Sequence, residues 1–399
     1  MPEPVPVDGS RAFGAPGVPA WWAPGDKQAV GTALSDKSPV WFTLAEGVVT
    51  EVYYPRVDIA NTRDLQFLLV GDDADSFFEE RRDTLSVVKR SDSRALAWQV
   101  TNTERQGRFT IIKRVITDPA RPALLMHCAI QRHAAHGGPA LRPYLLLAPH
   151  INNRGDENSA EVVRFGDRCL LTAHRHDTHV ALACSLPLQQ ASAGYSGASD
   201  GWTDLRLHHR LAWRFSQAAQ GHVALTARLD GDVSRPFTVA LGFGGTAGEA
   251  CAHAVASADA DFSEVLAAYA SGWHDYCDTL QDLTGVAHDG GRQYYLSAMV
   301  IRAHEDREHP GAHIASLAIP WGEVAGDQNR AGYHLVGPRD LYHAATARLA
   351  AGDSAGALAA LHYLNRTQCA LARGRTVEFT FYWNDAGVWE GVNHAIAVA

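Results

Sequence analysis

Tyr333, Arg339 and Asp340 form the strongest candidate binding site in the sequence. They belong to Gly332-Tyr-His-Leu-Val-Gly-Pro-Arg-Asp-Leu341, where a loop rich in Gly and Pro leads into an expected helix. Arg offers a rigid fork of donors and Asp accepts two hydrogen bonds, so the adjacent pair could clamp neighbouring hydroxyls of a sugar ring. The pair could equally form a local ion pair at the start of the helix. These residues alone leave both interpretations open.

The preceding segment, Gly311-Ala-His-Ile-Ala-Ser-Leu-Ala-Ile-Pro-Trp-Gly-Glu323, adds an aromatic ring. Trp321 could stack on the C–H face of a sugar, although Trp residues more often belong to a core. Sugar hydrolysis also needs two carboxyl groups that flank the scissile bond. The sequence singles out no such pair, so the catalytic residues stay unknown. The nearby carboxylates are Glu323, Asp327, Glu378, Asp385 and Glu390.

Other chemistries find little support. The chain has no GxGxxG after a strand, no P-loop, no HExxH and no GxSxG. Its 20 His are dispersed and its 6 Cys lack zinc spacing, so we expect buried cysteines, no cofactor and no assignable metal, with calcium left open. A net charge of -9 argues against nucleic acid as a partner.

Nothing in the sequence predicts a membrane partner or an export signal. Runs of about twenty apolar residues, which a spanning helix needs, are absent. The opening Met1-Pro-Glu-Pro-Val-Pro also lacks the basic and apolar regions of a signal peptide. We therefore expect a cytoplasmic protein, with a periplasmic or secreted location left open.

The elements that must position these residues fall into two kinds. From about 13 to 245, short alternating or apolar runs are separated by Gly, Pro, Asn and Asp, which predicts antiparallel strands in a large β-sandwich. The clearest runs are 40–44, 48–54, 109–116, 123–130, 144–147, 180–186, 223–229 and 237–243.

Beyond about 250 the apolar spacing becomes helical. We expect a connecting helix around 262–280, helices at 294–304, 341–351 and 355–365, and Asp353 or Ser354 as an N-cap. Four to six helices are expected after Gly291, without strands and with one apolar face uncovered. The predicted domains are a sandwich at 12–250, a linker helix region at 251–290 and a helical domain at 291–399.

Several segments are specific enough to show a family resemblance. Gly311 to Glu323 and Gly332 to Asp340 resemble the opening of the catalytic domain in bacterial glucoamylases and glucodextranases of glycoside hydrolase family 15. The N-terminal part resembles the sandwich domain of those enzymes, notably in Trp22-Ala-Pro-Gly-Asp-Lys27, Glu51-Val-Tyr-Tyr-Pro-Arg56 and Arg63-Asp-Leu-Gln-Phe67. Nearly the whole chain is covered.

The resemblance implies an α+β multidomain protein, with an N-terminal antiparallel β-supersandwich, a linker helix and an incomplete (α/α)6 barrel. It implies an exo-acting α-glucosidase that hydrolyses terminal α-linked glucose from the non-reducing ends of maltodextrin or dextran with inversion. Tyr333, Arg339 and Asp340 match glucose-binding positions, and Trp321 joins them as a candidate. Both catalytic glutamates are expected beyond Ala399, so we expect a truncated form with little activity alone, and a monomer at full length.

Some residues depart from the family pattern. Gly337 replaces an aromatic residue two positions before the Arg. Thr376-Val-Glu-Phe-Thr-Phe-Tyr-Trp383 and Asn393-His-Ala-Ile396 replace two further motifs of the family. Two alternatives therefore stay open. One is a catalytically silent carbohydrate-binding module without the acid and base, and the other is a related trehalase or disaccharide phosphorylase.

Overall fold

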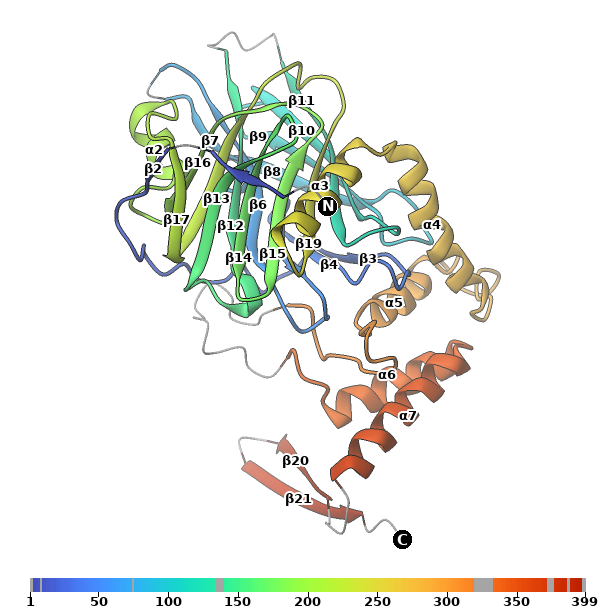
Figure 1. The fold of residues 1–399 in the computed structure, drawn as a ribbon. Coiled ribbons are helices and arrows are strands. Elements are labelled where there is room, and N and C mark those ends of the chain that lie inside the picture. The colour runs from blue at the N-terminus through green and yellow to red at the C-terminus, as the bar shows by residue number, and fades with distance from the viewer. Residues whose placement is uncertain are drawn as a thin grey trace.

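The computed structural model describes residues 3–7, 9–73, 75–133, 140–318, 333–371, 377–385 and 388–396, and from residue 368 on the backbone alone. A β-sandwich forms the N-terminal part (Figure 1). Helices α4 to α7 lead away from it toward a C-terminal hairpin (Figure 1).

Two large sheets form the sandwich, as predicted. The eleven-stranded sheet has the order β2-β17-β13-β14-β15-β19-β11-β10-β9-β8, with β1 beside β13, and the eight-stranded sheet has the order β16-β18-β12-β6-β5-β4-β3, with β7 beside β6. Only β2 and β17 pair in parallel among the described strand pairs. The predicted runs correspond to β4, β5, β10, β11, β12, β15, β18 and β19.

The eight predicted runs agree closely with the bounds of the strands to which they correspond. The eleven-stranded sheet contains β1 (Val5–Pro6), β2 (Ser10–Arg11), β8 (Thr84–Arg90), β9 (Trp98–Glu104), β10 (Phe109–Thr117), β11 (Ala123–Arg132), β13 (Asn158–Phe165), β14 (Arg168–Arg175), β15 (Thr178–Cys184), β17 (Phe215–Gly221) and β19 (Phe237–Gly244). The eight-stranded sheet contains β3 (Ala29–Thr32), β4 (Trp41–Ala45), β5 (Val48–Tyr53), β6 (Thr62–Val70), β7 (Phe77–Glu79), β12 (Arg142–Pro149), β16 (Leu188–Tyr195) and β18 (Val223–Leu229).

The main core lies between the two sheets. Phe67 and Leu145 of the eight-stranded sheet join Ile111 and Leu241 of the eleven-stranded sheet in one buried cluster. Burying each such side chain contributes about 1.5–3 kcal/mol. Five described cysteines are free, and four of them are buried, in agreement with the predicted role as small apolar residues.

A buried ion pair interrupts this apolar core. Lys113 on β10 lies 2.6 Å from the Glu80 carboxylate, at the start of the short helix α1 (Glu80–Asp83). Lys113 Nζ also donates to the Gly47 carbonyl at 2.9 Å, and Asn102 Nδ2 donates to Glu80 at 2.6 Å. The charges are therefore compensated inside the sandwich, as buried charges must be.

The predicted connecting helix at 262–280 is confirmed as α4, and a further helix, α3, precedes it. Helix α3 (Ala247–Asp259) packs Ala250, Cys251 and Ala254 on the outer face of the eleven-stranded sheet, so it is part of the sandwich (Figure 1). The connection is α4 (Phe262–Asp278), which Asp261 caps. The sequence reading missed α3 because its small residues give only a weak apolar stripe.

The junction between α4 and the sandwich is held by buried polar groups. Tyr269 Oη donates to the Leu96 carbonyl at 2.9 Å, and Trp273 Nε1 donates to the Thr32 carbonyl at 2.9 Å. Both side chains belong to the main buried cluster. A smaller helix, α2 (Gly201–His208), and a 3-10 turn at Ile151–Asn153 lie within the sandwich part of the chain.

The C-terminal part is only partly as predicted. The described residues after Gly291 form α5 (Arg292–Ala303), α6 (Pro338–Ala350) and α7 (Ser354–Leu371), which is fewer than the expected four to six helices. Asp353 caps α7 as predicted, since its Oδ1 accepts from Gly356 N at 2.9 Å. Four large apolar side chains on these helices are more than half exposed: Tyr342, Leu349, Leu358 and Leu361. One continuous uncovered apolar face remains a prediction.

The expectation that strands are absent near the C-terminus is wrong. Strands β20 (Val377–Asp385) and β21 (Val388–Ile396) form an antiparallel hairpin. The segment Val377-Glu-Phe-Thr-Phe-Tyr-Trp383 is rich in β-branched and aromatic residues, which favour a strand. An incomplete (α/α)6 barrel and the domain boundaries remain predictions. No helix among the described residues is long and apolar enough to cross a membrane.

Candidate functional site

Arg339 and Asp340 lie at the start of α6, and Tyr333 precedes this helix in the chain. Helix α6 begins after Gly337, so Arg339 and Asp340 lie in its first turn and Tyr333 lies in the turn before it. Tyr333 is 42% exposed, and the Arg339 and Asp340 side chains are 67% and 38% exposed. Trp321 lies outside the described residues.

Arg339 and Asp340 form a loose pair. Arg339 Nη2 lies 3.5 Å from Asp340 Oδ1, at the limit for a hydrogen bond. An exposed pair of this kind contributes little to stability, and its remaining donors and acceptors face solvent. The local ion pair is thus present, and it leaves both groups able to bind a ligand.

Gly337 shapes the position of the Asp340 carboxylate. A Cβ atom at Gly337 would lie 2.6 Å from Asp340 Oδ2, so any side chain there would displace the carboxylate. Gly337 therefore leaves room for the Asp340 carboxylate in the first turn of α6, where a negative charge is stabilised.

The turn that carries Tyr333 is bound to the sandwich. Tyr53 Oη, at the end of β5, donates to the Leu317 carbonyl and lies 3.3 Å from His334 Nε2. The Tyr53 and His334 rings meet edge to face with centroids 5.4 Å apart. Ser316 N donates to the Tyr333 carbonyl at 3.1 Å, which ties the two loop segments together.

An apolar cluster supports these hydrogen bonds. It joins the sandwich residues Trp22, Trp41, Tyr53, Val57 and Ala60 to the loop residues Ile314 and Leu317. Polar contacts reinforce the junction, because Asp306 accepts from Val57 N at 3.0 Å and Arg307 donates to the Ala33 carbonyl at 2.7 Å. Sequence reasoning missed this role of Tyr53, since its partners lie more than 260 residues away.

A second buried group, which we name the Arg348 cluster, fixes the other end of α6. It consists of Arg302, Glu305, His313, Arg348 and Asp353. Arg348 donates to Glu305, to Asp353 and to His313 Nε2, each at 2.7 Å. Arg302 also pairs with Glu305, so two guanidinium groups meet two carboxylates. The cluster joins α5, α6, α7 and the loop between α5 and α6.

Two glycines make room for the Arg348 cluster. A Cβ atom at Gly356 would lie 1.6 Å from Arg348 Nη2, so only Gly lets the guanidinium pass over α7. Gly311 has a φ of 89°, donates from its N–H to Glu305 Oε1 at 2.8 Å, and approaches α7 so closely that a Cβ would lie 2.1 Å from the Ala359 carbonyl oxygen.

Two buried histidines should make the protein sensitive to mild acid. Burial, and secondarily the positive charge of a nearby Arg, lowers the pKa of each residue to about 3. The Arg is Arg63 for His150 and Arg348 for His313. An unfolded His has a pKa of about 6.5, so the unfolded state binds protons that the native state excludes. As pH falls below about 6.5, the free energy of unfolding should decrease by about 1.4 kcal/mol per pH unit for each His.

Urea denaturation at several pH values between 6.5 and 5 measures the slope of the free energy of unfolding against pH. This pH interval lies above the range in which carboxyl groups titrate. His150→Gln should flatten the slope, whereas substitution of the exposed His288 by Gln should leave it unchanged. Equal slopes for the chain and for His150→Gln would contradict the prediction.

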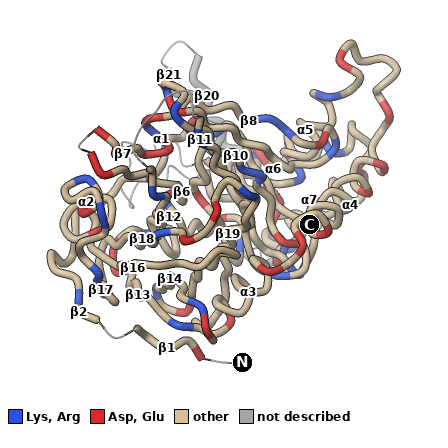
Figure 2. The backbone as a smooth tube through the Cα atoms, turned by 90° about the horizontal axis from the view of Figure 1, so that it is seen from above, with Lys and Arg blue, Asp and Glu red and all other residues tan. Residues whose placement is uncertain are grey.

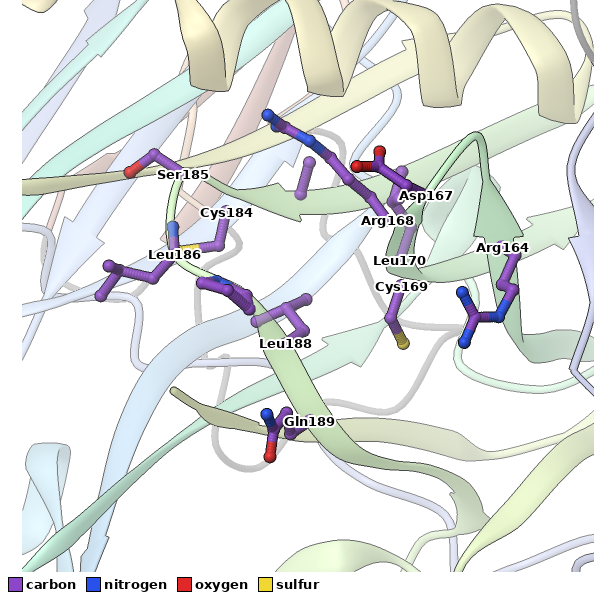
Figure 3. A pocket seen from close by; sticks show the side chains of 12 residues that line it. Arg164, Asp167, Arg168, Cys169, Leu170, Cys184, Ser185, Leu186, Leu188 and Gln189 are labelled. Atoms are coloured by element: carbon purple, nitrogen blue, oxygen red, sulfur yellow. The ribbon is translucent and has the colours of Figure 1, made fainter. Parts of the chain in front are cut away.

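A separate pocket of about 400 Å³ lies on the sandwich (Figure 3). Its walls come from β13 to β16, with Cys169 and Arg164 on one side and Leu186 and Leu188 on the other (Figure 3). Arg168 in this pocket is already paired with Asp259 at 2.7 Å. Of the sugar-binding candidates that the structure describes, Tyr333, Arg339 and Asp340, none lines this pocket.

The described residues hold no other evident chemical centre. No group of three or more His, Cys, Asp or Glu side chains within the described ranges is arranged to hold a metal ion. Lys and Arg positions are interspersed with Asp and Glu positions along the tube in Figure 2. We assign no catalytic acid or base.

Comparison with known proteins separates the sandwich and its helices α3 and α4 from the rest of the chain. The family described as "Glucodextranase, domain N" matches residues 12–278, from before β3 to the last residue of α4. The chain belongs to this family. The glucodextranase N domain of this chain thus includes the sandwich and the two helices, α3 and α4, that pack on it or lead from it.

Two relatives extend the likeness beyond the glucodextranase N domain. A glucoamylase from Clostridium sp. (strain G0005) is 36% identical over 355 residues, which are 88% of this chain and 49% of that protein. A crystal structure of a bacterial glucoamylase complexed with acarbose has a TM-score of 0.86 at 34% identity and covers 92% of this chain and 53% of that chain. The predicted resemblance is confirmed, and the chain spans about half the length of these relatives.

Proposed function

We propose that the chain is part of an exo-acting α-glucosidase of the glucoamylase or glucodextranase type, in which Tyr333, Arg339 and Asp340 hold the terminal glucose. The observation that carries the proposal is the exposed Arg339–Asp340 pair in the first turn of α6, the helix that follows Tyr333 in the chain. The relatives support it, since one is a glucoamylase and the other binds acarbose.

The chemistry of each group suits a glucose ring. The Arg339 fork can donate to two neighbouring hydroxyls while Asp340 accepts from a hydroxyl, and Tyr333 offers a ring face and a hydroxyl. These groups bind and orient the sugar. Hydrolysis with inversion needs in addition two carboxyl groups about 6.5–9.5 Å apart, with water between the base and the anomeric carbon. Because we assign no such pair here, binding is the property to test.

We expect the chain to bind acarbose, and Arg339→Ala or Asp340→Asn to weaken that binding by about 10- to 100-fold, since hydrogen bonds to charged groups contribute about 1.5–3 kcal/mol. Isothermal titration calorimetry measures the dissociation constants. The matched control is Arg235→Ala, because Arg235 and Asp232 also form an exposed pair, at 3.3 Å, on the sandwich.

Each outcome of this titration decides something. No binding of acarbose by the unaltered chain would contradict the proposed function. Binding that survives both Arg339→Ala and Asp340→Asn would show that the glucose lies elsewhere.

Because we assign no carboxyl pair among the described residues, the second candidate is a catalytically silent carbohydrate-binding module. Release of glucose from maltodextrin or dextran separates the two candidates, because the module would bind the α-glucan without turnover. Comparison of the two substrates also tests the choice between α-1,4 and α-1,6 linkages. A monomeric full-length form, the compartment and the exclusion of nucleic acid and membrane remain predictions.

A further inference from the structure

Tyr53 of the sandwich contacts the segment that carries the candidate glucose site. We propose that Tyr53 and His334 are positioning residues, which hold the Tyr333 turn in the geometry that binds glucose, so that the sandwich itself takes part in forming the site. This inference rests on the proposed function and assigns these residues no contact with the sugar.

The hydrogen-bond geometry defines the role of each group. The Tyr53 hydroxyl has one hydrogen, which it donates to the Leu317 carbonyl. Its oxygen can then only accept from His334 Nε2, 3.3 Å away, so this assignment places a hydrogen on Nε2. Burial, with a further contribution from Glu51, raises the pKa of Tyr53 well above its ordinary value, and the hydroxyl therefore keeps its hydrogen.

Three contacts brace the turn against the preceding loop. The Tyr53 hydroxyl donates to the Leu317 carbonyl and contacts His334 Nε2. Ser316 N donates to the Tyr333 carbonyl at 3.1 Å. His334 is buried while its neighbour Tyr333 is 42% exposed. The buried ring thus anchors the backbone from which the Tyr333 side chain reaches solvent.

The sandwich provides a rigid base for this brace. Tyr53 is fully buried, pairs in register with Trp41 of β4, and packs in the apolar cluster with Trp22. Arg307 adds a second anchor for the loop after α5, through the Ala33 carbonyl at 2.7 Å. A site held in its binding geometry before the ligand arrives loses less entropy on binding, which raises affinity.

The test compares two buried tyrosines whose hydroxyl groups donate to backbone carbonyls in different segments. Tyr53→Phe removes the hydroxyl that braces the Tyr333 turn. Tyr269→Phe removes a hydroxyl that is equally buried and also donates to a backbone carbonyl, but at the α4 junction. Tyr53→Phe should weaken acarbose binding by about 5- to 10-fold, the value of one to two neutral hydrogen bonds, while Tyr269→Phe should change it less than about 2-fold.

Two variants of His334 keep the test decisive if one tyrosine variant folds poorly. His334→Ala removes the donor and should weaken acarbose binding like Tyr53→Phe. His334→Gln keeps an N–H donor and should retain part of the affinity. The combination of Tyr53→Phe with His334→Ala should be no worse than the stronger single effect, because both break the same brace. Circular dichroism melting confirms that each variant is folded at the temperature of the titration.

The outcomes separate this inference from the proposed function. Unchanged acarbose binding by Tyr53→Phe and His334→Ala, with binding still lost in Arg339→Ala, would refute the brace and keep the glucose site. Equal losses in Tyr53→Phe and Tyr269→Phe would also refute it, because they would reflect general loosening. Failure of the unaltered chain to bind acarbose would overturn the proposed function and this inference with it.

Discussion

Replacement of Arg348 by Met is expected to lower the free energy of unfolding by about 3–5 kcal/mol, the usual cost of removing one partner from a buried ion pair. The side chain is 4% exposed and donates to Glu305, Asp353 and His313. Glu305 keeps Arg302 as a partner, but Asp353 loses its cation inside the protein. Chemical denaturation in urea at neutral pH measures the loss.

A matched control comes from α7. Arg366 is exposed, so Arg366→Met should change the free energy of unfolding by less than about 0.5 kcal/mol. Adding Asp353→Asn to Arg348→Met should cost less than the sum of the single changes, since the uncompensated carboxylate is then gone. A loss below about 1 kcal/mol for Arg348→Met would mean that the Arg348 cluster does not hold the helices together.

An effect of similar size is expected in the sandwich from Lys113→Met, again about 3–5 kcal/mol. The substitution keeps the length and apolar stem of the side chain but leaves the Glu80 carboxylate without its cation at 2.6 Å. The Gly47 carbonyl also loses a donor at 2.9 Å. The same urea titration, followed by tryptophan fluorescence, measures the decrease.

Lys113→Met has a control substitution at Lys89 and a compensating substitution at Glu80. Lys89 on β8 is exposed, and Lys89→Met should leave the free energy of unfolding within about 0.5 kcal/mol. The double variant Lys113→Met with Glu80→Gln should recover part of the loss, because no net charge is then buried. If the double variant is less stable than Lys113→Met alone, hydrogen bonds from Phe67 N and Asn102 to Glu80, rather than charge, dominate the site.

The sandwich could be predicted well from the sequence because its signals are local. The run at 223–229 coincides with β18, and the alternation of side chains fixes which residues enter the core. Asp353 was recognisable as a cap for the same reason, since the side chain and its N–H partner are three residues apart. Helix α3 and the β20–β21 hairpin were not predicted. Helix α3 has only a weak apolar stripe, and the hairpin follows a helical segment.

The pairing of Arg339 with Asp340 could be predicted from the sequence. The long-range contacts that hold this segment in place could not. Arg339 and Asp340 are neighbours in a recognisable loop-to-helix segment, so their meeting required no knowledge of the fold. The contacts of Tyr53 with His334 and of Arg348 with Gly356 depend on tertiary packing over long or irregular separations. No periodic pattern encodes them, and their residue types alone resemble ordinary core positions.

The buried donors at the junction also bear on how a sugar can reach the site. Tyr269, Trp273, Arg307 and Tyr53 all tie the sandwich to the segments that follow it. A hinge rotation between the two halves would break these bonds together, at about 1 kcal/mol for each, and would expose the apolar cluster around Trp41. Entry and release of a ligand should therefore proceed through rotamer changes of exposed side chains such as Tyr333, on a frame that stays closed.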